Sequence, residues 1–171
     1  MPLLRGRRHD EGTMRYQMRE KLLAIGDDFW IETGDGQRAF KVNGKALRIR
    51  DTLVLETPTG DELYSIQEKK LHIRDTMRIE RNGENVATVK KALVTPLRDR
   101  FSVDVQGGDD MEAKGNILDH EYKIESDGDE VAAVSKKWFR LRDTYGVEIE
   151  PGQDDALILA ITVCVDALTH D

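Results

Sequence analysis

The segment Leu47-Arg48-Ile49-Arg50-Asp51-Thr52-Leu53-Val54-Leu55 decides the fold, because the chain repeats it. It returns as Leu71-His72-Ile73-Arg74-Asp75-Thr76-Met77-Arg78-Ile79, in weaker form within residues 97–103, and clearly again at 139–147. The central arginine stands at positions 50, 74, 98 and 142, so the first three copies are evenly spaced and the fourth follows a longer interval. Repetition at a fixed period of this length is typical of a fold assembled from one supersecondary unit.

A second repeated phrase lies between these copies. It begins with a glycine and reads Gly60-Asp61-Glu62-Leu63-Tyr64-Ser65-Ile66, with counterparts at 83–89 and 128–134 and a weaker one at 36–42. A lysine pair closely follows each of the three stronger copies, at Lys69-Lys70, Lys90-Lys91 and Lys136-Lys137. The lysine pairs are therefore part of the repeating unit.

Inside each unit the hydrophobic period is two, which is typical of half-buried strands. Met77 and Ile79, Val103 and Val105, and Val147 and Ile149 each flank a charged residue, and Leu53 and Leu55 have the same spacing. The breaks carry turn residues, among them Asn82-Gly83 and residues 127–128, which suit tight hairpins because such turns need positive φ. The sequence predicts a mainly β fold, an antiparallel meander that closes into a barrel and so leaves no exposed edge.

The carboxyl-terminal run from Ala156 to Val165 has no polar stripe and is predicted to form a buried helix. Asp154 or Asp155 can cap its amino terminus. A buried strand is the alternative, since isoleucine, valine and threonine are common here. The run has about half of the roughly 20 apolar residues that span a bilayer, so we do not expect an integral membrane protein.

The aspartates of the first phrase, Asp51, Asp75, Asp99 and Asp143, share parity with the apolar residues beside them. A strand running straight through them would bury each carboxylate at a high desolvation cost. We therefore predict a turn or bulge at each aspartate, with an acidic ligand-binding ring as the alternative.

Composition restricts the classes of function. The 171 residues suit one domain, and 33 acids against 26 bases give a net charge of −7, which argues against a nucleic-acid binder. The single cysteine, Cys164, excludes an intramolecular disulfide and a thiolate zinc site. Residues 1–13 lack the apolar stretch of a signal peptide, so we expect a cytoplasmic location. They also have too few apolar residues to fold, so we expect a disordered tail followed by one barrel domain over 14–171. Met14, where the patterned sequence begins, is an alternative start.

The arrangement resembles the LURP-one-related family, within the wider group of phospholipid scramblases and the carboxyl-terminal domain of Tubby proteins. The resemblance runs from about Met14 to Asp171 and is most specific at the opening 14–29 and at the terminal run 154–166. It implies a Tubby-like barrel of 12 strands around one hydrophobic helix. Tubby-like domains bind phosphoinositides and scramblases act at membranes, whereas many LURP-one-related proteins have no assigned activity.

Two hypotheses for function follow. The first is a site for an anionic ligand, such as a phospholipid head group, on the cationic residues near the repeats: Lys69, Lys70, Lys90, Lys91, Lys136, Lys137, Arg74 and Arg140. An even number of strands per repeat brings equivalent positions to one end of the barrel, and an odd number alternates them between ends. The second is a protein-interaction scaffold or regulatory protein with no small ligand, whose apolar patch would include Trp30 or Trp138.

An enzyme is not expected, and neither is a cofactor. The four histidines lack metal-ligand spacing, and no catalytic elbow, phosphate-binding loop or dinucleotide fingerprint is present. The acidic segments Asp109-Asp110 and 127–130 could attract calcium, but neither follows a full EF-hand pattern, and we interpret them as solvated hairpin turns.

Overall fold

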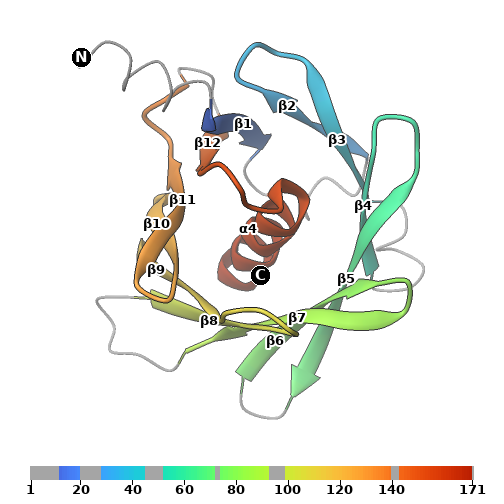
Figure 1. Ribbon diagram of the computed structural model, residues 1–171, viewed down its shortest axis with the longest axis vertical. Coiled ribbons are helices and arrows are strands. Elements are labelled where there is room, and N and C mark those ends of the chain that lie inside the picture. Colours follow the sequence, from blue (N-terminus) through green and yellow to red (C-terminus); the bar gives the residue numbers. More distant parts are fainter. Residues whose placement is uncertain are drawn as a thin grey trace.

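The computed structural model describes the backbone of residues 12–19, 28–44, 52–71, 74–92, 99–139 and 143–170, and the side chains of 12–19, 28–44, 52–67, 76–92, 100–139 and 143–169. Twelve strands precede one long helix (Figure 1). The strands are β1 (Met14–Arg19), β2 (Phe29–Thr33), β3 (Arg38–Asn43), β4 (Thr52–Glu56), β5 (Glu62–Leu71), β6 (Arg74–Arg81), β7 (Glu84–Lys91), β8 (Asp99–Val105), β9 (Met111–Asn116), β10 (Glu121–Ser126), β11 (Asp129–Ser135) and β12 (Thr144–Ile149), and the helix is α4 (Asp155–His170). Residues 1–11, which belong to the predicted tail, lie outside the described residues.

The strands form a closed antiparallel barrel in which each strand pairs with its neighbours in sequence. The first and last strands close the ring, with Met14 opposite Ile149 and Arg19 opposite Thr144. In Figure 1 the ring surrounds α4. The predicted fold class is confirmed, including the number of strands that the family resemblance implies.

One period of the sequence repeat corresponds to two strands. The register shifts after Ile31, Leu55 and Ile79, which are equivalent positions of successive repeats near the ends of β2, β4 and β6. The hairpin glycines Gly36, Gly60, Gly83 and Gly128 all have positive φ, between 81° and 97°. Two strands are an even number, so equivalent positions of successive repeats return to the same end of the barrel.

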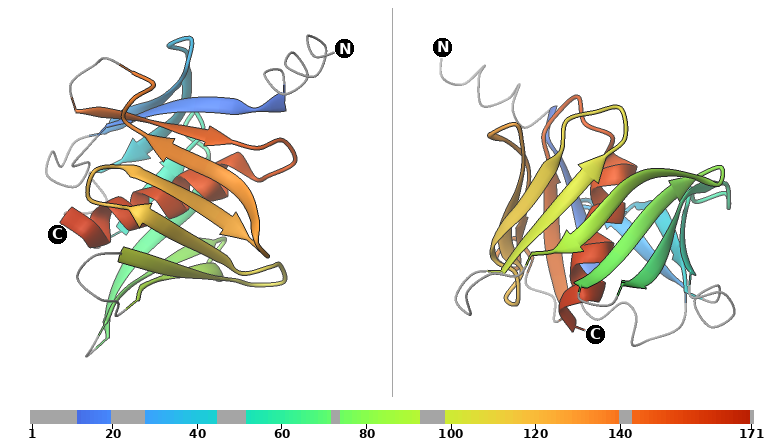
Figure 2. Two further views of the ribbon diagram at one scale, coloured as in Figure 1. Left: turned by 90° about the vertical axis from the view of Figure 1, so that its left-hand side faces the viewer. Right: turned by 90° about the horizontal axis from the view of Figure 1, so that it is seen from below.

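The barrel therefore has two different ends. The hairpin end carries the turns 34–37, 57–61, 82–83, 106–110 and 127–128, together with the connection 150–154 into the helix. At the opposite end the strands β5, β7 and β11 finish with, or run directly into, the three lysine pairs, and we call it the lysine end. The left view of Figure 2 has α4 running through the barrel with its carboxyl terminus at one end.

Helix α4 supplies the core of the barrel. From Ile158 to Leu168 every side chain is at most 5% exposed, and the inward faces of the strands pack around it. Asp154 caps the helix by accepting the Leu157 N–H at 3.1 Å on Oδ1, as predicted. The helical interpretation is thus confirmed over the buried strand. Among the described residues, no helix is long and apolar enough to cross a membrane.

The predicted turns at the aspartates are confirmed in part. Asp143 stands in a turn with φ of 57° just before β12. At Asp75 the prediction is wrong, because β6 already begins at Arg74 and Asp75 pairs with Lys70 in an unbroken register. Asp99 is the first residue of β8, opposite Gly115, and Asp51 lies outside the described residues. Asp75 and Asp99 thus lie at strand ends, at the rim of the barrel. At the rim an aspartate can be part of a strand without lying in the core.

Candidate functional site: the lysine end of the barrel

The backbone register aligns two of the lysine pairs. Lys69 on β5 stands opposite Thr76 on β6, and Thr76 stands opposite Lys90 on β7. Lys70 and Arg74 lie at the ends of the same strands. The side chains of Lys69, Lys70 and Arg74 lie outside the described residues, as does all of Arg140, so four of the eight cationic side chains are described.

The two lysines at the end of β7 differ in their ion pairing. Lys90 Nζ lies 3.2 Å from Asp104 Oδ2, so its charge is compensated across the β7–β8 pair. Lys91, opposite the fully buried Phe101, has no ion partner among the described residues. Of these two lysines, the one without an ion partner among the described residues is therefore Lys91, the last residue of β7.

The third lysine pair follows β11 and is held by a carboxylate. Glu121 Oε1 accepts the Ser135 hydroxyl at 2.9 Å and the Lys136 N–H at 3.1 Å, and the Lys137 N–H donates to Ser135 Oγ at 3.1 Å. These bonds fix the backbone, while both lysine side chains are exposed. Within the described part of the chain, Lys137 has no ion partner.

The two residues after this pair anchor it to the outer wall of the barrel. Trp138 and Phe139 pack over Gly146 of β12, and a Cβ at Gly146 would stand 2.6 Å from Trp138 Cε3 and 2.8 Å from Phe139 Cε2. The Arg15 guanidinium lies 4.8 Å from the centre of the Trp138 ring and pairs with Glu148 at 2.7 Å. Lys136 and Lys137 are consequently presented from a segment fixed at both ends.

Two lysines without an ion partner among the described residues lie at the lysine end, where Lys90 is paired. Lys41, Lys114 and Lys123 on the barrel wall each lie within 4.0 Å of a carboxylate, in the pairs with Asp28, Glu125 and Glu130. Such exposed pairs contribute little stability but neutralise one another locally. Lys91 and Lys137, which lack such partners among the described side chains, are both at the lysine end.

The turns at the hairpin end are acidic. Its turns and its connection to the helix contain seven carboxylates and no lysine or arginine, namely Asp35, Asp61, Asp109, Asp110, Asp127, Glu150 and Asp154. Asp110 Oδ1 accepts the Val105 N–H at 3.0 Å, and Asp154 serves as the helix cap. No group of three ligating side chains that could hold a metal ion occurs among the described residues. The turns of the hairpin end are thus acidic, whereas the lysine end carries its lysines together with carboxylates such as Asp119 and Glu121.

Beneath the lysine end lies a buried contact between a histidine and an aspartate that the sequence did not predict. His120 Nε2 lies 2.8 Å from Asp166 Oδ1 of α4, both side chains are 4% exposed, and the imidazole stacks on Tyr145 with ring centres 4.2 Å apart. Asp166 is the one charged residue between Ala156 and Leu168, and a buried carboxylate requires a partner. That rule predicts the existence of a partner but not which of the many histidines, lysines and arginines supplies it.

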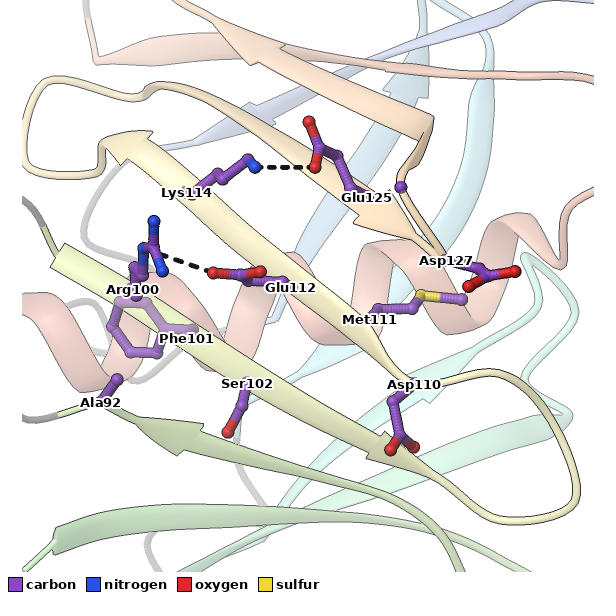
Figure 3. Close-up of a pocket in the computed structure, with 11 residues that line it drawn as sticks. Ala92, Arg100, Phe101, Ser102, Asp110, Met111, Glu112, Lys114, Glu125 and Asp127 are labelled. Atoms are coloured by element: carbon purple, nitrogen blue, oxygen red, sulfur yellow. Dashed lines mark ion pairs between the residues drawn. The ribbon is translucent and has the colours of Figure 1, made fainter.

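A groove of about 660 Å³ crosses the outer face of β8, β9 and β10 (Figure 3). Both of its cations are paired within it, Arg100 with Glu112 at 3.3 Å and Lys114 with Glu125 at 2.9 Å. Asp110 and Asp127 lie at its hairpin end. The groove is therefore acidic or self-compensated, and it is a poor site for an anion.

The tryptophans named for a protein interface are both partly covered. Trp30 has the Arg38 guanidinium 4.4 Å from its ring centre and Lys41 Nζ at 6.0 Å, and Trp138 is covered by Arg15. Neither ring forms an open apolar patch by itself, since each has a cation over one face.

Comparisons with known proteins agree with this architecture. The model of the LURP-one-related family matches residues 14–166. A crystal structure of a protein from Arabidopsis thaliana is similar, with a TM-score of 0.69 and 19% sequence identity over 92% of this chain and 91% of that one. At that identity the likeness concerns the fold alone. Among curated proteins, no match is found.

Proposed function

Because the chain belongs to the LURP-one-related family and its barrel is filled by its own helix, we propose that it is a non-enzymatic binding module for an anionic phospholipid head group. The site is the lysine end, with Lys91, Lys136 and Lys137 as the described contact residues. One observation carries the proposal: the repeat of two strands brings all three lysine pairs to one end of the barrel.

The charge distribution supports this assignment. A chain with net charge −7 is repelled by an anionic surface on average, so binding requires a local positive field with the acidic residues turned away. Here the carboxylates of the hairpin turns lie at the opposite end from the lysine pairs. Each lysine close to an anionic membrane surface contributes about 1 kcal/mol, and the attraction decays over about 8 Å at physiological ionic strength.

A binding role fits the geometry better than a catalytic one. The barrel interior is occupied by α4 and the inward side chains of the strands, whereas a catalytic site usually needs a concave pocket with convergent titratable groups. Exposed lysines on a fixed segment are suited to contacting phosphate oxygens without further chemistry.

Sedimentation with phosphatidylcholine vesicles, with and without anionic phospholipid, tests the proposal. We expect binding only to the anionic vesicles, weakening as salt is added. The combined variant Lys91→Gln, Lys136→Gln and Lys137→Gln should reduce the partition coefficient by roughly 100-fold, from about 1 kcal/mol per lysine.

The matched control, Arg38→Gln, Arg81→Gln and Lys123→Gln, changes the net charge equally but on the wall and near the hairpin turns. It should bind as the wild type does. If both triple variants lose the same affinity, the site is not at the lysine end. If wild-type protein ignores anionic vesicles, the head-group proposal fails, and a protein-interaction scaffold becomes the better account.

A further inference from the structure

The turn between β9 and β10 places an apolar side chain at the lysine end. Leu118 is 58% exposed, the most exposed large apolar side chain among the described residues. Around the barrel, this turn lies between the end of β7 with Lys90-Lys91 and the end of β11 with Lys136-Lys137. An exposed leucine with lysine pairs on the strands to either side, β7 beyond β8 and β11 beside β10, is a combination that an anionic bilayer surface can bind, with the apolar group among the acyl chains and the cations at the head groups.

The turn is held rigidly in this position. Ile117 on one side is 2% exposed and part of the core, and the Asn116 amide donates to Asp119 Oδ2 at 2.8 Å. On the other side His120, with φ of 53°, is tied to Asp166 of the central helix at 2.8 Å. Exposure of Leu118 is therefore set by the fold, since its neighbours are fixed on both sides and the leucine cannot turn inward without breaking them.

A second exposed apolar residue gives an internal comparison. Met14 is 40% exposed and begins β1, so it stands at the hairpin end among the carboxylates. No lysine or arginine occurs in the turns of that end. The two exposed apolar side chains thus lie at opposite ends, Leu118 at the end of the lysine pairs and Met14 at the end of the acidic turns.

We propose that the barrel docks end-on onto an anionic bilayer, with Leu118 inserted among the lipid chains and the hairpin turns directed away from the membrane. This inference rests on the proposed head-group function and adds the occupant, the orientation and the inserted residue. Asp119 is the acidic neighbour of Leu118. Its carboxylate accepts a hydrogen bond from the Asn116 side-chain amide, and its backbone N–H donates to Asn116 Oδ1, so Asp119 is bonded within the turn.

A fluorophore at Leu118 tests the insertion. The native Cys164 is 0% exposed, so a thiol-reactive environment-sensitive dye labels the Leu118→Cys variant at the new position only, and unlabelled wild type checks this. Asp109→Cys, in the β8–β9 turn, is the matched control at the hairpin end. With vesicles of phosphatidylcholine and phosphatidylserine, we expect a blue shift and quenching by chain-labelled lipid for the dye at position 118, and neither for the dye at position 109.

Partitioning of unlabelled variants gives a second readout. Leu118→Gln should weaken binding to these vesicles by about tenfold through lost apolar burial, whereas Met14→Gln should change it by less than about twofold. If the wild type binds the vesicles but the dye at 118 is neither shifted nor quenched, the end-on insertion is wrong while the head-group function stands. Binding of soluble inositol phosphate without vesicle binding would also overturn the docking but keep an anion site, and binding to neither would overturn both.

Discussion

Trp138 packs against Gly146 so closely that a Cβ on the glycine would lie 2.6 Å from Trp138 Cε3. The contact lies on the outside of β12 and immediately follows Lys136 and Lys137 in sequence. Together with the bonds from Glu121 to the preceding backbone, it determines where the third lysine pair is presented. The position of Lys136 and Lys137 therefore depends on the absence of a side chain at Gly146 in the neighbouring strand.

Gly146→Ala should lower the free energy of unfolding by about 1–3 kcal/mol, because the added methyl group has no space beneath the indole. Urea denaturation measures the change. Gly34→Ala is the control, since its nearest atoms would be at 3.7 Å and its expected effect is within about 0.5 kcal/mol. Equal effects of the two substitutions would contradict the packing account.

The pair between His120 and Asp166 should show strong energetic coupling. Asp166→Leu removes the buried carboxylate, and His120→Asn shortens the partner with a residue that tolerates positive φ. Each substitution alone should cost about 3 kcal/mol, because it leaves the other polar group buried without this partner. The double variant should lose less than the sum by at least about 1 kcal/mol in urea denaturation. Additive losses would mean that the two side chains do not act as a pair.

Alkaline pH should destabilise the protein through Tyr64. Its hydroxyl donates to Asp154 Oδ2 at 2.5 Å, and burial, reinforced by this carboxylate, raises the pKa of Tyr64 to about 12. The folded state holds the Tyr64 proton more tightly than the unfolded state, whose tyrosine pKa is near 10. The stability that the protonated Tyr64 contributes is therefore fully present below about pH 10 and is lost as the pH approaches 12.

The free energy of unfolding of the wild type should thus fall over this pH interval. The free energy of unfolding of the Tyr64→Phe variant should fall less steeply. Urea denaturation between about pH 9 and pH 12 provides the comparison. Identical slopes in the wild type and the variant would exclude Tyr64 as a contributor.

Cys164 should be unreactive in the folded protein. It is 0% exposed on α4, and burial raises the pKa of its thiol, so little thiolate is available at neutral pH. Ellman's reagent at about pH 8 should release no chromophore from native protein and one equivalent after denaturation. Rapid reaction of the native protein would show that the helix leaves the barrel readily.

Local signals in the sequence were sufficient for the barrel and its helix. Alternation around Leu53 and Met77 predicted the strands, glycines such as Gly83 marked hairpins because positive φ is needed there, and Asp154 marked the start of α4. The period of the repeat also determines whether the lysine pairs lie at one end of the barrel. That question was left open only because the number of strands per repeat follows from pairing, which is not a local property.

Contacts between distant segments could not be predicted in the same way. The partner of Asp166 is 46 residues away in the sequence. Trp138 packs on Gly146, and the need for a glycine there arises only because the fold places β12 beside the segment that follows β11. At Asp75 the parity argument predicted a turn, but strand β6 simply begins one residue earlier, at the barrel rim. In each case the missing information was the position of a residue relative to the end of the barrel.

The most direct test of the central claim is the amide spectrum of isotope-labelled protein with bicelles containing anionic phospholipid. We predict that signal shifts and broadening concentrate at the lysine end, at Lys91, Leu118, Lys136 and Lys137, with no change for Asp35, Asp109 and Asp127 in the hairpin turns. Perturbations centred on the hairpin turns, or along the groove over β8–β10, would contradict a binding site at the lysine end.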